Sequence, residues 1–368
     1  MKVPLLDLKA QFTTIKDETM EIVEKVFDSQ QFINGPEVKL LEQKIAEYCN
    51  CKRAIGVSSG TDALLCALMA LDIGPGDEVV TTPFTFFATA GSIWRVCAKP
   101  LFVDIEPDTF NINPELIEEP ISEDTKAIIP VHLFGQIADM DEINKIADNL
   151  ALDVIEDACQ SIGATYKGEK AGSLGTVGCF SFFPSKNLGC AGDGGIITTN
   201  DEELADKMEM IRMHGSKPKY YHKIVGANFR LDTLQAAVLL VKFKYLDTWS
   251  EKRRQNASKY NQLLSNIEQI KLPVIKEYNV SVFNQYVIRA QKRDELRNFL
   301  SSKEIGTEIY YPLSLHEQEC FKGLGYKKGD FPESEKAASE VIALPIYPEL
   351  TDDQIEYVAN SIKEFYNM

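Results

Sequence analysis

Polar residues gather at four places where an apolar, strand-like run of the sequence ends. They are residues 58–63, residues 156–160, residues 181–195 and residues 226–232. In an open α/β sheet, ligands bind beyond the carboxyl ends of the strands. These four segments therefore hold the candidate site residues, and their side-chain types indicate which chemistry they could perform.

The first segment, Ser58-Ser59-Gly60-Thr61-Asp62-Ala63, joins a predicted strand to a predicted helix. Free N–H groups at a helix start, together with the helix dipole, bind anions. Gly60 would let a ligand approach the backbone, and the Thr61 hydroxyl could donate to a phosphate. The alternative is a plain helix cap, which Ser and Thr often provide. The segment lacks the lysine of a P-loop, so it does not predict a Walker-type site.

The second and third segments supply an acid and an amine. Asp157 follows an apolar run beside Glu156 and could pair with a buried cation, and Gln160 lies three residues further on. The alternative for an isolated acidic pair is a helix cap. Lys186 follows an aromatic strand end and precedes a Gly-rich loop. A partly desolvated lysine has a lowered pKa and can form a Schiff base, whereas the alternative is a surface lysine in a turn.

The fourth segment carries Asn228 and Arg230, which could reach an anionic ligand or could belong to a capping loop with one salt bridge. Together the segments offer a phosphate cup, an acid for a ring nitrogen and a Schiff-base lysine, and pyridoxal phosphate needs all three. A carboxylate near the pyridine nitrogen keeps it protonated and makes the ring an electron sink. Residues 83–87, Pro-Phe-Thr-Phe-Phe, could supply an aromatic face for the ring or could be hydrophobic core.

The elements that must position these residues alternate between strand and helix from residue 52 to about residue 200. The patterns predict strands over residues 53–57, 78–82, 99–103, 126–132 and 153–155, and helices over residues 61–71, 85–96 and 140–149. Alternation at this spacing indicates parallel strands with crossover helices. Residues 179–183 and 195–199 are also strand-like, but the loop between them is too short for a helical crossover. We therefore expect these two strands to pair antiparallel.

The C-terminal part of the chain has a different pattern. One helical pattern runs from about residue 233 to residue 264, and it is followed by strand-like residues 280–290 and 308–311 and helical residues 292–303 and 352–366. We therefore expect an α/β fold in two parts. Residues 1–245 would form a large domain with an N-terminal helical segment and a mixed, mostly parallel sheet flanked by helices. Residues 246–368 would form a small α+β domain, and a cleft between domains is a favoured ligand site.

Composition argues against several classes of function. The 368 residues include 39 Lys and Arg against 55 Asp and Glu, a net charge of −16, which argues against nucleic acids and polybasic membrane patches. The sequence contains no run of the ~18 apolar residues that a membrane span needs, and we expect no signal peptide. The eight cysteines are scattered and form no C-x-x-C pair. We therefore expect no disulfides, no metal site and a cytoplasmic protein.

The sequence resembles the DegT-type nucleotide-sugar aminotransferases, which are pyridoxal phosphate enzymes of the aspartate aminotransferase fold (fold type I). The match runs nearly end to end. It includes residues 32–38 (FINGPEV), 59–64 (SGTDAL), 74–79 (GPGDEV), 130–136 (PVHLFGQ), 156–160 (EDACQ), 182–189 (FFPSKNLG), 230–237 (RLDTLQAA) and 344–348 (LPIYP).

The resemblance implies a role for each candidate residue. Lys186 would form the Schiff base and shuttle protons, and Asp157 would hold the pyridinium nitrogen. The remaining cofactor contacts would come from Gln160 at the ring hydroxyl, Phe86 stacked on the ring, and Gly60, Thr61 and Ser181 at the phosphate, with Asn228 reaching the cofactor of the other subunit in a homodimer with shared active sites. Arg230 and Tyr311 would contact the sugar nucleotide or the amino donor. All of these residues are present.

The implied reaction moves an amino group from L-glutamate to a keto group of a UDP- or dTDP-linked sugar, for amino-sugar, lipopolysaccharide and other cell-surface polysaccharide biosynthesis. Residues 182–195 most resemble members that act at C3, and amination at C4 is the alternative. Some relatives have His in place of the lysine and act as dehydratases, whereas this chain has Lys186. Many relatives also carry a His where Asn284 or Gln285 stands, and this departure concerns substrate details.

Two other classes of function remain as rivals. A non-catalytic regulator with the same fold would be expected to lack Lys186 or Asp157, and both are present. A cysteine desulfurase needs a reactive, exposed cysteine in a mobile loop. Cys190, in the Gly-rich loop near Lys186, is the candidate for such a thiol, and its alternative is a buried packing role.

Overall fold

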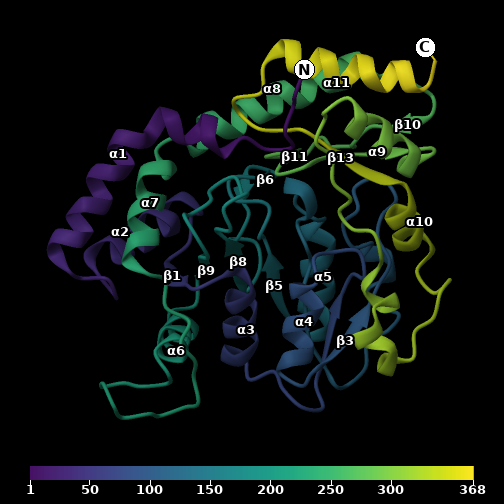
Figure 1. Ribbon diagram of the computed structural model, residues 1–368. Coiled ribbons are helices and arrows are strands. Elements are labelled where there is room, and N and C mark those ends of the chain that lie inside the picture. Colours follow the sequence, from purple (N-terminus) through teal and green to yellow (C-terminus); the bar gives the residue numbers. More distant parts are fainter. Residues whose placement is uncertain (368) are drawn as a thin grey trace.

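The computed structural model describes residues 1–367, and its centre is a seven-stranded sheet (Figure 1). The strand order is β1 (Arg53–Val57), β9 (Gly195–Thr199), β8 (Val177–Ser181), β5 (Asp153–Asp157), β4 (Thr125–Ile128), β2 (Glu78–Thr81) and β3 (Lys99–Phe102). Strand β9 pairs antiparallel with both of its neighbours, and the other pairs in the sheet are parallel. The expected mixed, mostly parallel sheet with an antiparallel β8–β9 pair is confirmed.

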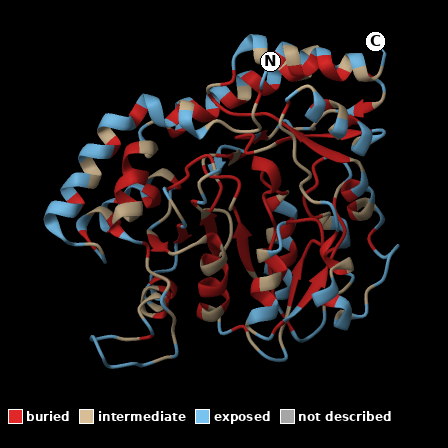
Figure 2. Cartoon of the chain, viewed as in Figure 1, coloured by how far each residue is buried: buried red, intermediate tan, exposed pale blue. Residues whose placement is uncertain are grey.

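Helices cover both faces of this sheet. One face packs against α3 (Gly60–Ala70), α4 (Ala88–Arg95) and α6 (Glu202–Arg212). The other face packs against α2 (Pro36–Tyr48), α5 (Met140–Leu150) and α7 (Thr233–Phe243). The strands are buried between these layers (Figure 2), which explains why their sequences are mostly apolar. Helix α1 (Leu8–Ser29) lies outside this core and packs along α7.

The C-terminal part builds its own apolar core around a small sheet. This sheet has the antiparallel order β10 (Ile270–Lys271), β12 (Tyr286–Ala290) and β13 (Val341–Leu344), and it packs with α8 (Leu246–Leu264), α9 (Arg293–Ser302) and α11 (Asp352–Phe365). Val3 from the start of the chain is buried in the same core. A third sheet joins β11 (Asn279–Val280), β6 (Thr165–Tyr166) and β7 (Glu169–Lys170), and α10 (Pro332–Glu340) precedes β13.

The single helix expected over residues 233–264 is wrong. The structure has two helices there, because α7 ends at Phe243 and α8 begins at Leu246. Two side chains at this break, Lys244 and Tyr245, both hydrogen-bond the Glu18 carboxylate on α1. A tertiary contact with a helix more than 200 residues away in sequence thus favours the break.

Three other expected elements are shorter or divided. The strand expected over residues 280–290 is two strands, β11 and β12, which belong to different sheets. Residues 308–311 contribute one isolated bridge, between Glu308 and Ala343. The helix expected from residue 85 begins at Ala88, because the preceding residues form a turn whose Pro83 carbonyl accepts the Leu315 N–H at 2.8 Å.

We propose that the chain divides into domains at the break between α7 and α8, into residues 1–245 and residues 246–368. Two separate apolar cores support the division, although Val282 joins the first core and Val3 joins the second. Across residues 1–367, every helix is too short or too polar to cross a membrane.

Candidate active site at the carboxyl edge of the sheet

The predicted site residues meet at one edge of the central sheet. Strands β1, β8, β5 and β2 all point the same way, so their carboxyl ends lie together. Asp157 is the last residue of β5, Ser181 is the last residue of β8, and Gly60 begins the helix that follows β1. This is the edge at which ligands bind in open α/β sheets.

The Asp157 carboxylate is buried and is oriented by two donors. Its Oδ2 atom accepts a hydrogen bond from the Thr89 hydroxyl at 2.7 Å, and its Oδ1 atom accepts one from the Cys159 backbone N–H at 3.3 Å. The Thr89 hydroxyl also lies 3.1 Å from that of Thr85, which is in the turn before α4. The carboxylate therefore does not cap a helix, and its direction is set by a side-chain hydroxyl of α4 and a backbone N–H of the loop after β5.

Lys186 lies in the loop after β8, in a turn that its own N–H closes by donating to the Phe183 carbonyl at 2.8 Å. The alternative interpretation is a surface lysine in a turn. The turn is present, but the amine is not free in solvent. Burial lowers the pKa of the Lys186 amine below its ordinary value of 10.5, and the nearby Cys159 and Asp157 oppose this shift. Burial disfavours the charged form of an amine, so this environment favours the neutral, nucleophilic form.

The start of α3 forms an anion-binding geometry. The Ser59 side chain caps the helix by accepting the Asp62 N–H at 3.0 Å, and the hydroxyls of Ser58 and Ser59 donate to the Asp62 carboxylate at 2.6 and 2.9 Å. The N–H groups of Gly60 and Thr61 lie in the first turn, where no intrahelical acceptor reaches them. The helix cap and the anion site can therefore coexist, because Ser59 provides the cap whereas Gly60 and Thr61 provide the free N–H groups.

Close packing explains the glycine at position 60. A Cβ atom there would lie 2.7 Å from the Ser181 Cβ atom and 2.8 Å from the Cys159 Sγ atom. Contacts this short do not occur between real side chains, so only glycine fits without a shift of the neighbours. Gly60 thus brings the helix start against the ends of β5 and β8, which carry Asp157 and the Lys186 loop.

Gln160 joins the site to the C-terminal part of the chain. Its Nε2 atom donates to the Tyr311 hydroxyl at 3.1 Å, and its Oε1 atom accepts the Phe134 N–H at 2.7 Å. Burial raises the pKa of Tyr311, so the phenol stays protonated. The Phe86 ring lies 6.2 Å from the Tyr311 ring and is 56% exposed, which leaves its face open to a ligand.

Only one of the two candidate residues of the fourth segment lies at this site. The backbone of Arg230 pairs with Val57 at the end of β1, and the buried Arg230 Nε atom has no hydrogen-bond partner within residues 1–367. Asn228 is exposed, and its backbone pairs with Met213 at the base of the long loop between α6 and α7. The structure thus places Arg230 beside the anion-binding helix start but leaves Asn228 on the surface.

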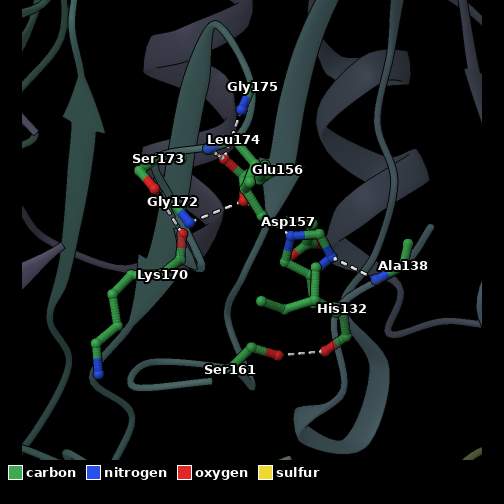
Figure 3. Close-up of polar contacts among 12 residues, drawn as sticks. His132, Ala138, Glu156, Asp157, Ser161, Lys170, Gly172, Ser173, Leu174 and Gly175 are labelled. Carbon is green, nitrogen blue, oxygen red and sulfur yellow. Dashed lines mark hydrogen bonds and ion pairs between the residues drawn. The ribbon is translucent and has the colours of Figure 1, made fainter. Parts of the chain in front are cut away.

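Glu156 and His132 form a buried pair behind the site (Figure 3). Their Oε2 and Nε2 atoms lie 2.9 Å apart, and both side chains are fully buried. The His132 Nδ1 atom accepts the Ala138 N–H at 3.3 Å, so the Nε2 atom carries the proton and donates to Glu156. The carboxylate also accepts three backbone N–H groups of the turn at residues 172–175, each at 2.8 Å. Glu156 therefore shapes this turn, while Asp157 points to the other face of the strand.

The Cys190 thiol is buried. It donates to the Phe182 carbonyl at 2.9 Å and lies 3.0 Å from the Gly192 carbonyl, and burial raises its pKa to about 11. A reactive cysteine needs a lowered pKa and exposure. This environment is the opposite of the one that a desulfurase requires.

Sequence reasoning missed Thr89 and the His132–Glu156 pair. Thr89 lies in the first turn of α4 and Thr85 lies in the turn before it, and nothing in their spacing connects them to Asp157. Glu156 and Asp157 are consecutive residues at the end of a predicted strand. Because successive strand side chains point to opposite faces of the sheet, the sequence could have predicted that only one of the two carboxylates faces the site.

The residues brought together fit pyridoxal phosphate. The helix start at Gly60 offers N–H groups to a phosphate, at a place where a Cβ atom would collide with its neighbours. Asp157 offers a carboxylate held by two donors, and Lys186 offers a desolvated amine. These are the groups that a phosphate, a pyridinium nitrogen and an aldehyde respectively require.

Comparisons with known proteins agree with this arrangement. A pleiotropic regulatory protein of Geobacillus stearothermophilus is 54% identical over 100% of this chain and 99% of its own length. A UDP-2-acetamido-2-deoxy-3-oxo-D-glucuronate aminotransferase of Pseudomonas aeruginosa is 43% identical, covering 98% of this chain and 99% of its own. The crystal structure of S. venezuelae DesV in complex with a ketimine intermediate has a TM-score of 0.98 and 39% identity, covering 100% of this chain and 99% of its own. The model of one protein family matches residues 13–363, and the chain belongs to that family, the DegT/DnrJ/EryC1/StrS aminotransferases.

Proposed function

We propose that this protein transfers an amino group from L-glutamate to a keto group, at C3, of a nucleotide-linked sugar, with pyridoxal phosphate as its cofactor. The observation that carries the proposal is the desolvated Lys186 amine, whose charge interacts with Asp157 at the same edge of the sheet as the α3 N-terminus. The Pseudomonas aeruginosa relative, whose name specifies a 3-oxo sugar nucleotide, supports C3. Amination at C4 is the alternative position.

The residues of the chain divide the work of such a reaction. When bound, the cofactor supplies an aldehyde for the lysine and a protonated ring that withdraws electrons from the reacting carbon. Asp157, held by Thr89, keeps the proton on the ring nitrogen. The Lys186 Nζ atom, whose pKa is lowered by desolvation, would accept a proton from the substrate carbon and return it to the cofactor carbon. Gly60 and Thr61 hold the phosphate through the start of α3.

A regulatory role is a second candidate, because the Geobacillus stearothermophilus relative is named as a pleiotropic regulatory protein. A non-catalytic regulator has no need of a desolvated lysine beside an oriented carboxylate. This chain keeps Lys186, Asp157 and the donors that orient the Asp157 carboxylate. These residues favour catalysis, with or without a regulatory role in addition.

The experiment that tests the function is spectroscopic and then chemical. Protein incubated with pyridoxal phosphate should absorb near 400 nm, and L-glutamate should move this band to shorter wavelength. UDP- and dTDP-linked 3-keto and 4-keto sugars should then be tested for glutamate-dependent amination by mass spectrometry. Failure to take up the cofactor would favour the regulator. A spectrum that does not respond to glutamate would contradict the assigned donor, and amination of 4-keto sugars alone would contradict C3.

The first prediction concerns Lys186. We expect Lys186→Ala to reduce turnover to background, because it removes the amine that the proposed function uses to move the proton at the reacting carbon. Circular dichroism should still show a folded protein and thermal unfolding should stay cooperative, because the Lys186 amine is desolvated and so its removal costs no solvated charge. Normal turnover in this variant would refute the proposed function.

We further propose that the protein acts as a homodimer whose two sites each use Asn228 of the other subunit. Asn228 is exposed and does not reach the other site residues of its own chain. It stands at the base of a loop that presents Tyr220, Tyr221 and Val225 to solvent. Large exposed apolar side chains of this kind mark surfaces that bind another protein.

A further inference from the structure

Asn187, the residue after Lys186, is buried, and both the Nδ2 and the Oδ1 atoms of its side chain are hydrogen-bonded. Its Nδ2 atom donates to the Val282 carbonyl at 2.9 Å, and its Oδ1 atom accepts from the Asn284 Nδ2 atom at 2.7 Å. Both side chains are more than nine-tenths buried, with 5% and 8% exposed. The loop that carries the lysine is therefore tied, through two hydrogen bonds, to residues 95 and 97 positions away in the sequence.

The segment that makes these bonds with Asn187, residues 281–285, is itself held from two sides. It connects β11, which pairs with β6, to β12 in the C-terminal sheet. The Val282 N–H donates to the Gly135 carbonyl at 3.0 Å. On the other side, the buried Arg253 guanidinium of α8 donates to two carbonyl oxygens of the segment, at 3.2 and 3.4 Å. The direction of the Asn284 side chain is therefore set by a backbone that has little freedom.

A second chain of hydrogen bonds runs from the same segment to Gln160. The Gln285 N–H donates to the Phe134 carbonyl at 3.4 Å, and the Phe134 N–H donates to the Gln160 Oε1 atom at 2.7 Å. Gln160 then reaches the Tyr311 hydroxyl. Lys186 and Gln160, which lie on different strand ends, thus share one anchor in residues 281–285.

We propose that Asn187 and Asn284 are positioning residues that act as one unit to aim the Lys186 amine. The proposal rests on the proposed function of Lys186 and adds the pair that directs it. A lysine side chain has four rotatable carbon–carbon bonds, so the place of its backbone decides which atoms Nζ can reach. A shift of about 1 Å in a reacting group can slow a reaction about 100-fold. Neither asparagine is needed to bind substrate in this role.

The test compares Asn187→Ala, Asn284→Ala, the double variant and Asn284→His, all loaded with pyridoxal phosphate. Each single alanine variant should lower kcat about tenfold while KM for glutamate changes less than about twofold, since the loss falls on the reacting step. The double variant should lose no more than about the larger single loss, because the residues act as one unit. Asn284→His keeps an N–H donor and should recover most of kcat.

Two further measurements separate aiming from plain stability. The pH at which the absorbance of the lysine-bound cofactor changes should move in the alanine variants, and this readout needs no turnover. In cofactor-free protein, the pH dependence of Lys186 acetylation by acetic anhydride, followed by mass spectrometry, should move as well. The matched control is Asn279→Ala, another buried amide, whose Nδ2 atom donates to the Ile137 carbonyl at 3.0 Å and which does not contact the lysine loop. It should move neither pH dependence.

The proposal is overturned if the losses of the two single variants multiply in the double variant, or if Asn279→Ala moves the two pH dependences as much as Asn284→Ala does. It is also overturned if kcat and both pH dependences stay unchanged. Failure of the proposed function looks different. In that case the unchanged protein ignores glutamate, while the acetylation of Lys186 still reports whether the asparagine pair controls its amine.

Discussion

At the scale of single residues, each group of the candidate site owes its orientation or its pKa to very few neighbours. The Asp157 Oδ2 atom accepts its hydrogen bond from Thr89, and the Lys186 amine depends on burial for its lowered pKa. Hydrogen bonds to charged groups and desolvation are each worth enough to change a rate by an order of magnitude. Changes of one side chain can therefore test each effect separately.

The second prediction concerns Thr89→Val, which keeps the shape of the side chain but removes the hydroxyl that donates to Asp157. A hydrogen bond to a charged group contributes about 1.5–3 kcal/mol, so we expect kcat to fall about 10- to 100-fold. The control is Thr85→Val, because the Thr85 hydroxyl is buried and contacts that of Thr89 but not the carboxylate. Steady-state kinetics of both variants provide the measurement, and equal losses would show that the direct contact with Asp157 is unimportant.

The third prediction concerns the pH dependence of stability in cofactor-free protein. The pKa of Lys186 is lower in the folded protein than its ordinary value of 10.5, so between these two values the unfolded chain binds more protons. The free energy of unfolding therefore increases as pH rises through this range. At pH values below this range, the buried positive charge lowers the free energy of unfolding. Lys186→Met has no titratable group at this position, so its free energy of unfolding lacks this pH dependence. Urea unfolding should show that Met stabilises the protein relative to Lys at pH 7, with a smaller difference at pH 9.5. A constant difference would contradict the lowered pKa.

The sequence could identify residues whose type alone suggests chemistry, but not the residues that orient them. Lys186 and Asp157 could be proposed because an amine and a carboxylate follow apolar strands within motifs that resemble one family, although each residue alone also fits a surface turn or a helix cap. Thr89 could not, because its partner lies 68 positions away and a threonine in a helix is common. Asn187 and Asn284, which are 97 positions apart, have the same difficulty.

At the scale of secondary structure, the site depends on how closely the start of α3 approaches the ends of β5 and β8. Gly60 permits that approach, since a Cβ atom would lie 2.7 Å from Ser181 and 2.8 Å from Cys159. The strands that carry these residues are buried on both faces and cannot move apart without opening the core.

The fourth prediction follows from this contact. Gly60→Ala should lower the free energy of unfolding by about 1–3 kcal/mol, the usual range for overpacking, and weaken binding of pyridoxal phosphate at least about tenfold. The control is Gly323→Ala, because a Cβ atom there has no neighbour within 4 Å. Thermal unfolding and a fluorescence titration with the cofactor are the measurements. Unchanged cofactor affinity in Gly60→Ala would mean that the helix start does not hold the phosphate.

The order of strands and helices in the first 200 residues could be predicted because alternating apolar runs and helical periodicity are local signals. The break between α7 and α8 could not, since it involves Lys244 and Tyr245 meeting Glu18 on α1. The division of residues 280–290 into β11 and β12 has the same origin. Its turn includes Phe283 at φ 42°, a left-handed conformation that residue type does not signal.

At the scale of the whole molecule, apolar side chains remain exposed along α1 and on the loop between α6 and α7. Phe27 on α1 is 52% exposed and Val225 on the loop is 89% exposed. Both elements lie toward the left of the view in Figure 1, on the side where α2 and α7 also lie. With a net charge of −16, copies of the protein repel one another at long range, and burial of these apolar side chains would oppose that repulsion. This is the surface on which the proposed homodimer would form.

The fifth prediction tests whether two chains share each active site. Lys186→Ala removes the amine from its own chain, and Asn228→Asp places a negative charge where the phosphate of the other chain's cofactor would lie. Each variant alone should be nearly inactive. A heterodimer of the two has one site with both Lys186 and Asn228 intact, so after random subunit exchange about a quarter of all sites should be active.

The control mixture, Lys186→Ala with Lys186→Met, cannot form an intact site and should stay inactive. Sedimentation must also give a dimer. If the first mixture is no more active than its separate components although subunits have exchanged, Asn228 serves its own chain or none, and the shared site has to be abandoned.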